Sequence, residues 1–385
     1  MTDPVKHSRR SFLQGQAAVR TVVDAAAGWI DSAAELLSPL VESSADVLHL
    51  QAHRRAMACD FELLYHADDD HRDDDGSVER QHEDESQSGD SRATEAALEA
   101  LDLIESLEAQ MTIYRDHSEV IAINNQAADH PVEVEPRLFG LLQLAQTLHR
   151  ETQGAFDLTT GPLLRAWGFL QREGRLPSEA EIRAALDRVG GDRLELDHER
   201  LTICFLDAGV EINLNAIGKG YALDRAAELL DERGLSDYLW HGGRSSVLAR
   251  GCNRADARAG WTIGLPNPEE PGQLLGQFHL HDGALATAGG ATQSFQHTGQ
   301  RYGHLLDPRI GWPAQGLLTA TALAPTAAEA DALATAFFVM GTEATGRYCD
   351  LHPQVSAVLV RSAGDSGPAM VETFGIDAQQ WTRFV

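Results

Sequence analysis

Residues 210–234 read VEINLNAIGKGYALDRAAELLDERG, and this stretch predicts a strand, a loop and a helix in succession. Residues 210–214 are typical of a strand, and a helical pattern from Tyr221 to Arg233 ends at Gly234. The loop between them, residues 213–220, closes on Gly218-Lys219-Gly220. A helix N-terminus behind such a loop can receive a phosphate, so this loop is a candidate anion site, with a plain tight turn as the alternative.

Lys219 is one of only two lysines among 31 basic residues. Because glycine lets a backbone approach a ligand closely, a compact ammonium between two glycines indicates that Lys219 contacts a ligand. The alternative is that a lysine stands here by chance. The loop is not a Walker A loop, which requires glycine at Asn213 and Ser or Thr at Gly220. The chain also lacks the G-x-G-x-x-G fingerprint after an early strand and the G-x-S-x-G elbow, which disfavours nicotinamide dehydrogenases and α/β-hydrolases.

Around this unit, the sequence predicts an α+β fold with a mixed or antiparallel sheet rather than a regular parallel wind. Apolar spacing, capping boxes and glycine stops predict helices over 93–111, 136–152, 178–190 and 326–341. Residues 194–196 and 201–205 predict a hairpin. Further strands are expected at 55–65, 238–240, 246–249, 261–265 and 317–323.

The composition excludes several classes of protein. The 385 residues carry 31 basic and 58 acidic side chains, a net charge of −27, which disfavours nucleic-acid binding and a polybasic membrane anchor. The four cysteines are widely spaced, which argues against a structural zinc site or a disulfide framework. No uncharged apolar run is long enough to predict a transmembrane segment.

The chain divides into an N-terminal tail, residues 1–54, and a folded domain, residues 55–385. The tail is expected to contain a helical segment and carries Ser8-Arg9-Arg10-Ser11-Phe12-Leu13, which is similar to a twin-arginine export signal. Charged residues interrupt the apolar run behind it, so export to the periplasmic side and a cytoplasmic location both stay open. Residues 67–92 hold eleven acidic and three arginine residues, which predicts a disordered insertion within the domain.

Two further segments contain candidate catalytic groups. Asp331 and Thr335 lie four apart on the late helix and offer two oxygen ligands suited to Mg²⁺; the alternative is that Asp331 only favours the first helical turn while Thr335 bonds back to a carbonyl. His304 is a candidate for proton transfer near neutral pH, with Asp307 close enough in sequence to orient it.

Four motifs in one order resemble the ApbE family of FAD:protein FMN transferases. They are Gly154-Ala155-Phe156-Asp157 with Gly161-Pro162-Leu163 and Trp167-Gly168-Phe169, then residues 216–224, then Gly303-His304-Leu305-Leu306-Asp307-Pro308-Arg309, then residues 330–335. Several motifs in a fixed order are far more specific than one. The resemblance implies an ApbE-like, T-fold-like architecture and a Mg²⁺-dependent transfer of FMN from FAD to a Thr or Ser hydroxyl of a target flavoprotein.

The resemblance also implies a set of site residues. Mg²⁺ would be held by the Ala216 carbonyl, Asp331 and Thr335, and His304 would take the proton of the target hydroxyl. The residues expected to line the FAD site are Met57, Tyr114, Ala155, Phe156, Asp157, Asn213, Lys219 and Leu306.

This chain departs from the family pattern at three places. Asn213 stands where the family usually has Asp, Ile310 where it has Thr, and Thr287-Ala288-Gly289-Gly290 where it has a Thr-Ser-Gly-Asp-like segment. Because Ile310 and Gly290 remove polar groups near the expected reaction centre, two other functions stay open. One is hydrolysis of FAD to FMN and AMP, and the other is flavin binding without catalysis.

Overall fold

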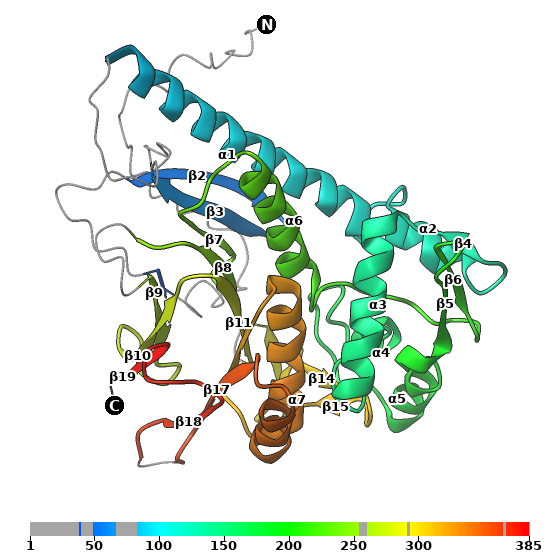
Figure 1. The fold of residues 1–385 in the computed structure, drawn as a ribbon. Coiled ribbons are helices and arrows are strands. Elements are labelled where there is room, and N and C mark those ends of the chain that lie inside the picture. Colours follow the sequence, from blue (N-terminus) through cyan, green and yellow to red (C-terminus); the bar gives the residue numbers. More distant parts are fainter. Residues whose placement is uncertain are drawn as a thin grey trace, which may run out of the picture. The chain divides into compact units, whose positions relative to one another are not determined.

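The computed structural model describes residues 38–39, 49–66, 83–253, 260–290, 293–364 and 367–384 (Figure 1). They belong to one compact unit, Ser32–Val385. The twin-arginine-like segment Ser8–Leu13 lies outside the described residues. Among the described helices, none combines the length and the apolar character needed to cross a bilayer.

The core of the fold is an eight-stranded sheet with the order β18-β17-β16-β11-β8-β7-β3-β2. All neighbouring strands in it are antiparallel. The strands are β2 (His49–Ala56), β3 (Cys59–His66), β7 (Tyr238–Gly242), β8 (Ser246–Arg250), β11 (Gly283–Gly289), β16 (Thr319–Ala324), β17 (Ser356–Arg361) and β18 (Met370–Phe374).

Three helices cover one face of this sheet: α1 (Glu83–Met111), α6 (Gly218–Glu232) and α7 (Ala327–Leu351) (Figure 1). Alanines of β11 and β16 face α7, and their small side chains let the helix pack closely against the sheet. The other face packs against a four-stranded sheet through a second apolar cluster. That sheet has the order β1 (Ser38–Pro39), β9 (Trp261–Pro266), β10 (Leu274–Leu280) and β19 (Trp381–Arg383).

Two smaller groups of elements complete the unit. The first holds α2 (Glu119–Gln126), α3 (Pro136–Glu151), a short 3-10 helix (Gly191–Arg193) and the sheet β4 (Val132–Glu133), β6 (Thr202–Phe205) and β5 (Leu194–Asp197). The second surrounds the buried Trp167. It holds α4 (Gly161–Ala166), α5 (Glu179–Leu186) and the hairpins β12 (Ser294–His297) with β13 (Gln300–Gly303) and β14 (Leu306–Asp307) with β15 (Trp312–Pro313).

The predicted helices, the 194–205 hairpin and the α+β class are confirmed, whereas the two strands predicted at 210–214 and 55–65 are wrong. Residues 210–214 pair with no strand, since Asn124 and the Leu158 carbonyl bond their backbone instead. Residues 55–65 are parts of two strands, because Met57 and Ala58 adopt positive φ and reverse the chain. Strands β1 and β2, which begin before the predicted boundary at 55, also pair within the sheets of this unit.

Two helices also extend beyond their predicted limits. Helix α1 begins at Glu83, so the last ten residues of the predicted acidic insertion are helical, while residues 67–82 lie outside the described part of the chain. Acidic residues suit a helical N-terminus, where the dipole favours negative charge. Helix α7 kinks at Gly341, where φ is 72°, and continues to Leu351.

Helices α6 and α7 cross at their N-terminal ends, and Gly220 makes this crossing sterically feasible. A Cβ at Gly220 would lie 2.0 Å from the Ala327 carbonyl oxygen. Asp224, one turn further along α6, accepts hydrogen bonds at 2.8 Å from the Ala327 and Ala328 amides. These amides are otherwise unsatisfied at a helix start, so α6 both contacts and caps α7.

We predict that Gly220→Ala lowers the free energy of unfolding by about 3 kcal/mol or more, because the added methyl overlaps the α7 backbone. The matched control is Gly140→Ala in α3, where a Cβ meets nothing within 4 Å. That change should be neutral or stabilising by about 0.5–1 kcal/mol, since alanine favours helix. Urea unfolding of both variants measures this, and equal stabilities would contradict the close crossing.

Candidate active site

The candidate active site forms where several strands of the central sheet end together. Gly242, at the end of β7, lies opposite Phe61, which places the turn at Met57–Ala58 beside the turn at 243–245. The Thr287 amide donates to the Ser245 carbonyl, and Gly289 pairs with Thr319, so β11 also ends here. The N-terminal ends of α6 and α7 meet the same edge through Gly220, Asp331 and Ser246.

Asp331 lies at the centre of this end of the sheet and is almost fully buried. The Gly220 amide donates to its Oδ2 at 2.8 Å, and the Ser246 hydroxyl donates to its Oδ1 at 2.5 Å. The Lys219 ammonium lies 3.9 Å from Oδ2. Two donors thus fix the orientation of this buried carboxylate, whose oxygens are of the kind that Mg²⁺ prefers.

The groups predicted to hold Mg²⁺ are of the kinds that this ion prefers. The Thr335 side chain is half-buried one turn beyond Asp331 along α7, and its role as a ligand remains a prediction. Ala216 lies in the loop that leads into α6. The described residues contain no cluster of three or more His, Cys, Asp or Glu arranged for a metal. One carboxylate with neutral oxygens nevertheless suits Mg²⁺ that is completed by phosphate and water.

Asn213 offers an unused donor at the start of the same loop. Its side chain is buried, and its Oδ1 accepts from the Asn215 amide at 2.9 Å. Its Nδ2 is buried without a partner in the described structure. Because a buried amide donor is costly to leave unpaired, a bound carbonyl or ring acceptor fits this position.

His304 is held by a backbone carbonyl. Its amide and its Nδ1 both lie near the Gln293 carbonyl oxygen, at 2.9 and 3.1 Å, and its ring meets Phe169 edge-on. Burial lowers the pKa of His304, the Gln293 bond opposes this and the charge of Lys219 adds to it, so that the pKa is about 4. Since a carbonyl only accepts, Nδ1 carries the proton and Nε2 keeps its lone pair as a base.

Asp307 does not orient His304, contrary to the sequence-based expectation. Its carboxylate binds the Arg309 guanidinium twice, at 2.8 and 2.7 Å, and accepts from the Arg309 amide. This bidentate pair fixes the loop that follows His304. Proximity in sequence could not show this, because His304 and Arg309 are both near Asp307, whereas Gln293, which binds His304, lies eleven residues before it.

Ala155, Phe156 and Asp157 are all buried, and contact with FAD remains a prediction for the three. Ala155 and Phe156 are buried in the main core. The Asp157 carboxylate accepts from Thr159 and the Gly191 amide and pairs with His149 at 3.1 Å. Burial alone would lower the pKa of His149, but its bond to Asp157 and the charge of Asp157 raise it overall.

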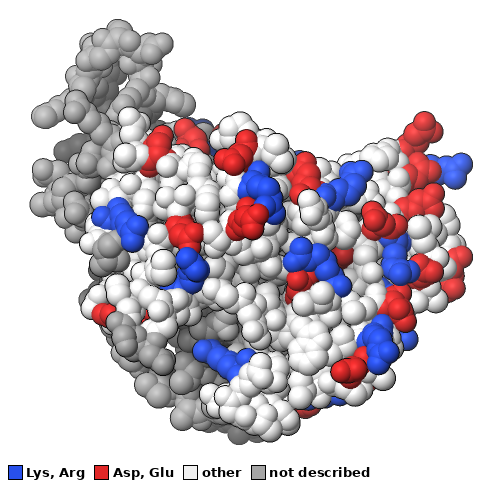
Figure 2. Space-filling view, turned by 90° about the horizontal axis from the view of Figure 1, so that it is seen from below, with Lys and Arg blue, Asp and Glu red and all other residues white. Residues whose placement is uncertain are grey.

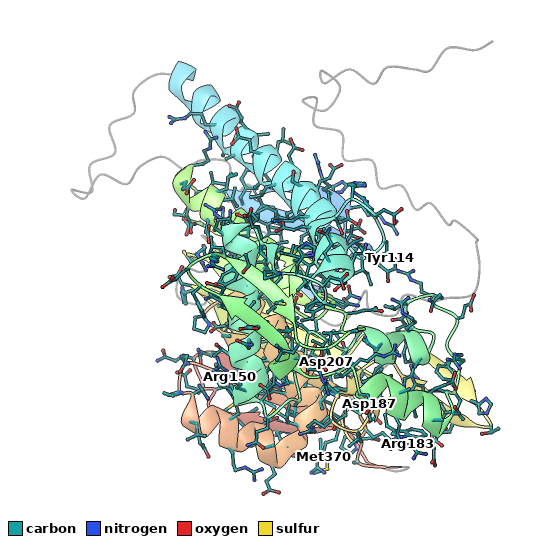
Figure 3. All side chains as sticks on the ribbon, turned by 90° about the vertical axis from the view of Figure 1, so that its right-hand side faces the viewer. Tyr114, Arg150, Arg183, Asp187, Asp207 and Met370 are labelled. Atoms are coloured by element: carbon teal, nitrogen blue, oxygen red, sulfur yellow. The ribbon has the colours of Figure 1, made fainter. Side chains whose placement is uncertain are left out.

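The other predicted flavin contacts differ in exposure. Met57 lies in the left-handed turn at the sheet end and is half-buried, whereas Leu306 is buried in the cluster around Trp167. Tyr114 is 66% exposed beyond the end of α1, far from Arg183 in α5 and from Asp187, which follows that helix (Figure 3). Its ring is therefore open to a ligand or solvent. Acidic and basic side chains intermix on the face seen from below, with no broad basic area (Figure 2).

Two of the departures from the family pattern, Gly290 and Ile310, lie in different surroundings. A Cβ at Gly290 would lie 3.1 Å from the Phe338 ring, so any larger residue there requires that ring to move. Ile310 is 56% exposed on the loop after Asp307. Sequence reasoning missed Ser246 and Gln293, and no pattern could distinguish Ser246 from its neighbour Ser245 before the register of β8 was known.

Known proteins share both the sequence and the fold. The chain is 31% identical over 244 residues to the FAD:protein FMN transferase of Klebsiella pneumoniae (strain 342), covering 63% of this chain and 74% of the relative. It is 30% identical over 261 residues to the enzyme of the same name from Haemophilus influenzae, covering 66% and 74%. The crystal structure of the ApbE protein from Thermotoga maritima superposes with a TM-score of 0.70 at 26% identity, covering 85% of this chain and 97% of that one.

The fold and the sequence motifs thus agree on one protein family. The model of the ApbE family matches residues 77–359, which contain His304, Asp331 and the loop before α6. This chain belongs to the ApbE family.

Proposed function

We propose that this protein transfers FMN from FAD to a Thr or Ser hydroxyl of a target flavoprotein, with Mg²⁺ required and AMP released. The observation that carries this proposal is the buried carboxylate of Asp331 with the Lys219 ammonium 3.9 Å from it. The charge of Lys219 also acts on the imidazole of His304, whose Nδ1 is bonded to the Gln293 carbonyl. The names of the relatives support the flavin chemistry.

The cationic part of the site would act on the pyrophosphate of FAD. Asp331, Thr335 and the Ala216 carbonyl would hold Mg²⁺, which supplies Lewis-acid neutralisation of phosphate charge when bound. Lys219 adds a second positive charge beside Asp331. Together they favour the build-up of negative charge on the leaving AMP, as phosphoryl transfer requires. The unpaired Nδ2 of Asn213 would donate to the flavin ring.

His304 would act on the acceptor. Its Nε2 takes the proton of the target hydroxyl while the hydroxyl oxygen forms a bond to the FMN phosphorus. The bond between that phosphorus and the oxygen bridging to AMP then breaks, and AMP departs with that oxygen. A neutral base with a fixed tautomer is available for this step because Nδ1 is bonded to Gln293. Binding of an anionic pyrophosphate nearby would raise the pKa of His304 and strengthen it as a base.

The direct test is intact-protein mass spectrometry of a candidate flavoprotein acceptor incubated with this protein, FAD and Mg²⁺. We predict that the acceptor gains the mass of one FMN. Asp331→Asn, which keeps the shape of the side chain but removes its charge, should lower the rate by about 100-fold or more, as for other groups that stabilise transition-state charge. Gln296→Ala, an exposed position on the β12–β13 hairpin, serves as the unaffected control.

The products distinguish the competing functions. Release of free FMN and AMP with no gain in acceptor mass would contradict transfer and support FAD hydrolysis at the same site. Binding of FAD with neither product, across several acceptors, would support a flavin-binding protein without catalysis. Undiminished transfer by the Asp331→Asn variant would contradict the assigned metal ligand.

A second prediction concerns the protonation of His304. In the free protein, ¹⁵N NMR should show Nδ1 protonated and Nε2 unprotonated across pH 5.5–8, because the pKa is held at about 4. Since the unfolded histidine takes a proton near 6.5, this residue should destabilise the fold as the pH falls from about 6.5 towards 4. His304→Gln should remove that part of the pH dependence and slow transfer by about 10²–10⁴-fold while FAD still binds. Titration of His304 near its usual 6.5 would contradict its burial.

A further inference from the structure

We propose that Ser246 is a positioning residue for the metal site: its hydroxyl fixes the Asp331 carboxylate in the orientation that receives Mg²⁺. The inference rests on the proposed function, because it concerns the same ion. Ser246 belongs to none of the motifs that carry the family resemblance, and the structure alone brings it to Asp331.

The position of Ser246 in the sheet explains the contact. It is the first residue of β8 and pairs with Ala286 of β11, whose side chain lies in the core cluster under the helices. Residues that lie directly opposite each other on antiparallel strands point to the same face of the sheet, so the Ser246 hydroxyl faces α7 as Ala286 does. The side chain is fully buried, and Asp331 is its hydrogen-bond partner.

Asp331 is consequently held from two directions. The sheet supplies a donor to Oδ1 through Ser246, and helix α6 supplies a donor to Oδ2 through the Gly220 amide. With both oxygens engaged, rotation of the carboxylate would break at least one bond to a buried charged group, which is costly. Each oxygen retains a further lone pair for a cation. Donors of this kind orient metal ligands, and their loss commonly weakens metal binding by about 10–100-fold.

The adjacent serine provides a matched control. Ser245 is half-buried, and its hydroxyl bonds the Gly242 carbonyl within the β7–β8 turn at 3.4 Å. Ser245→Ala removes the same atom one residue away and leaves both bonds to Asp331 in place. A difference between the two variants therefore reports the contact with Asp331 rather than a general effect of losing a serine hydroxyl.

The experiment measures Mn²⁺ binding by electron paramagnetic resonance in the full chain with FAD present, with competition by Mg²⁺. We expect Ser246→Ala to bind both ions about 10–100-fold more weakly and Ser245→Ala to bind as the parent does. FAD binding without metal should be unchanged in both variants. In the transfer assay, Ser246→Ala should need a higher Mg²⁺ concentration for half-maximal rate yet reach the parental rate at saturation, a split that general misfolding would not produce.

Equal metal affinity in Ser246→Ala and the parent would overturn the inference while leaving the proposed function intact. A loss of rate that saturating Mg²⁺ does not restore, with unchanged metal affinity, would also overturn it. If the parent transfers FMN but binds no metal, the assigned metal site fails and the inference fails with it. If the parent binds metal at Asp331 but transfers nothing, the proposed function fails, while the Ser246 comparison still decides the inference.

Discussion

The close crossing of helices α6 and α7 is the constraint on which the rest of the site depends. It requires glycine at position 220, because any side chain there would overlap the start of α7. The same glycine gives its amide to Asp331, and its neighbour Lys219 brings an ammonium to that carboxylate. Asp224 then caps the amides of α7. One backbone contact therefore places a cation, a buried carboxylate and a helix end together.

The antiparallel sheet makes this arrangement rigid. Its alanine-rich face allows α7 to approach, and its second face is covered by another sheet, so the strand ends have little freedom to move. Loops from distant parts of the sequence converge on this edge, including the turn at Met57 and the hairpin that precedes His304. A site assembled on strand and helix ends is held more accurately than one built on long loops.

Much of the fold followed from sequence patterns that act locally. The helices could be predicted because their apolar spacing and capping residues, such as Ser178 with Glu181, act over a few residues. The 210–214 strand was wrong because its pattern fits any buried extended segment, and only tertiary contacts with Asn124 determine that it joins no sheet. The helical start at Glu83 was missed because composition does not show that a neighbouring apolar stripe can extend a helix into acidic residues.

For the candidate site, sequence reasoning proposed Asp331, Lys219 and His304 but not the groups that hydrogen-bond to Asp331 and His304 in the structure. A hydrogen bond from Ser246 or to the Gln293 carbonyl depends on strand register and backbone position, which no motif encodes. The pairing of Asp307 with Arg309 shows the same limit, since both residues lie within one motif and only geometry separates a loop-fixing pair from a catalytic one.

The most direct test of the assigned site is a crystal structure of the protein with FAD and Mn²⁺, using the anomalous signal to place the ion. We expect the ion on Asp331, Thr335 and the Ala216 carbonyl, beside the pyrophosphate, with the flavin within hydrogen-bond reach of the Asn213 side chain. An ion bound elsewhere, or a flavin away from the loop before α6, would contradict it.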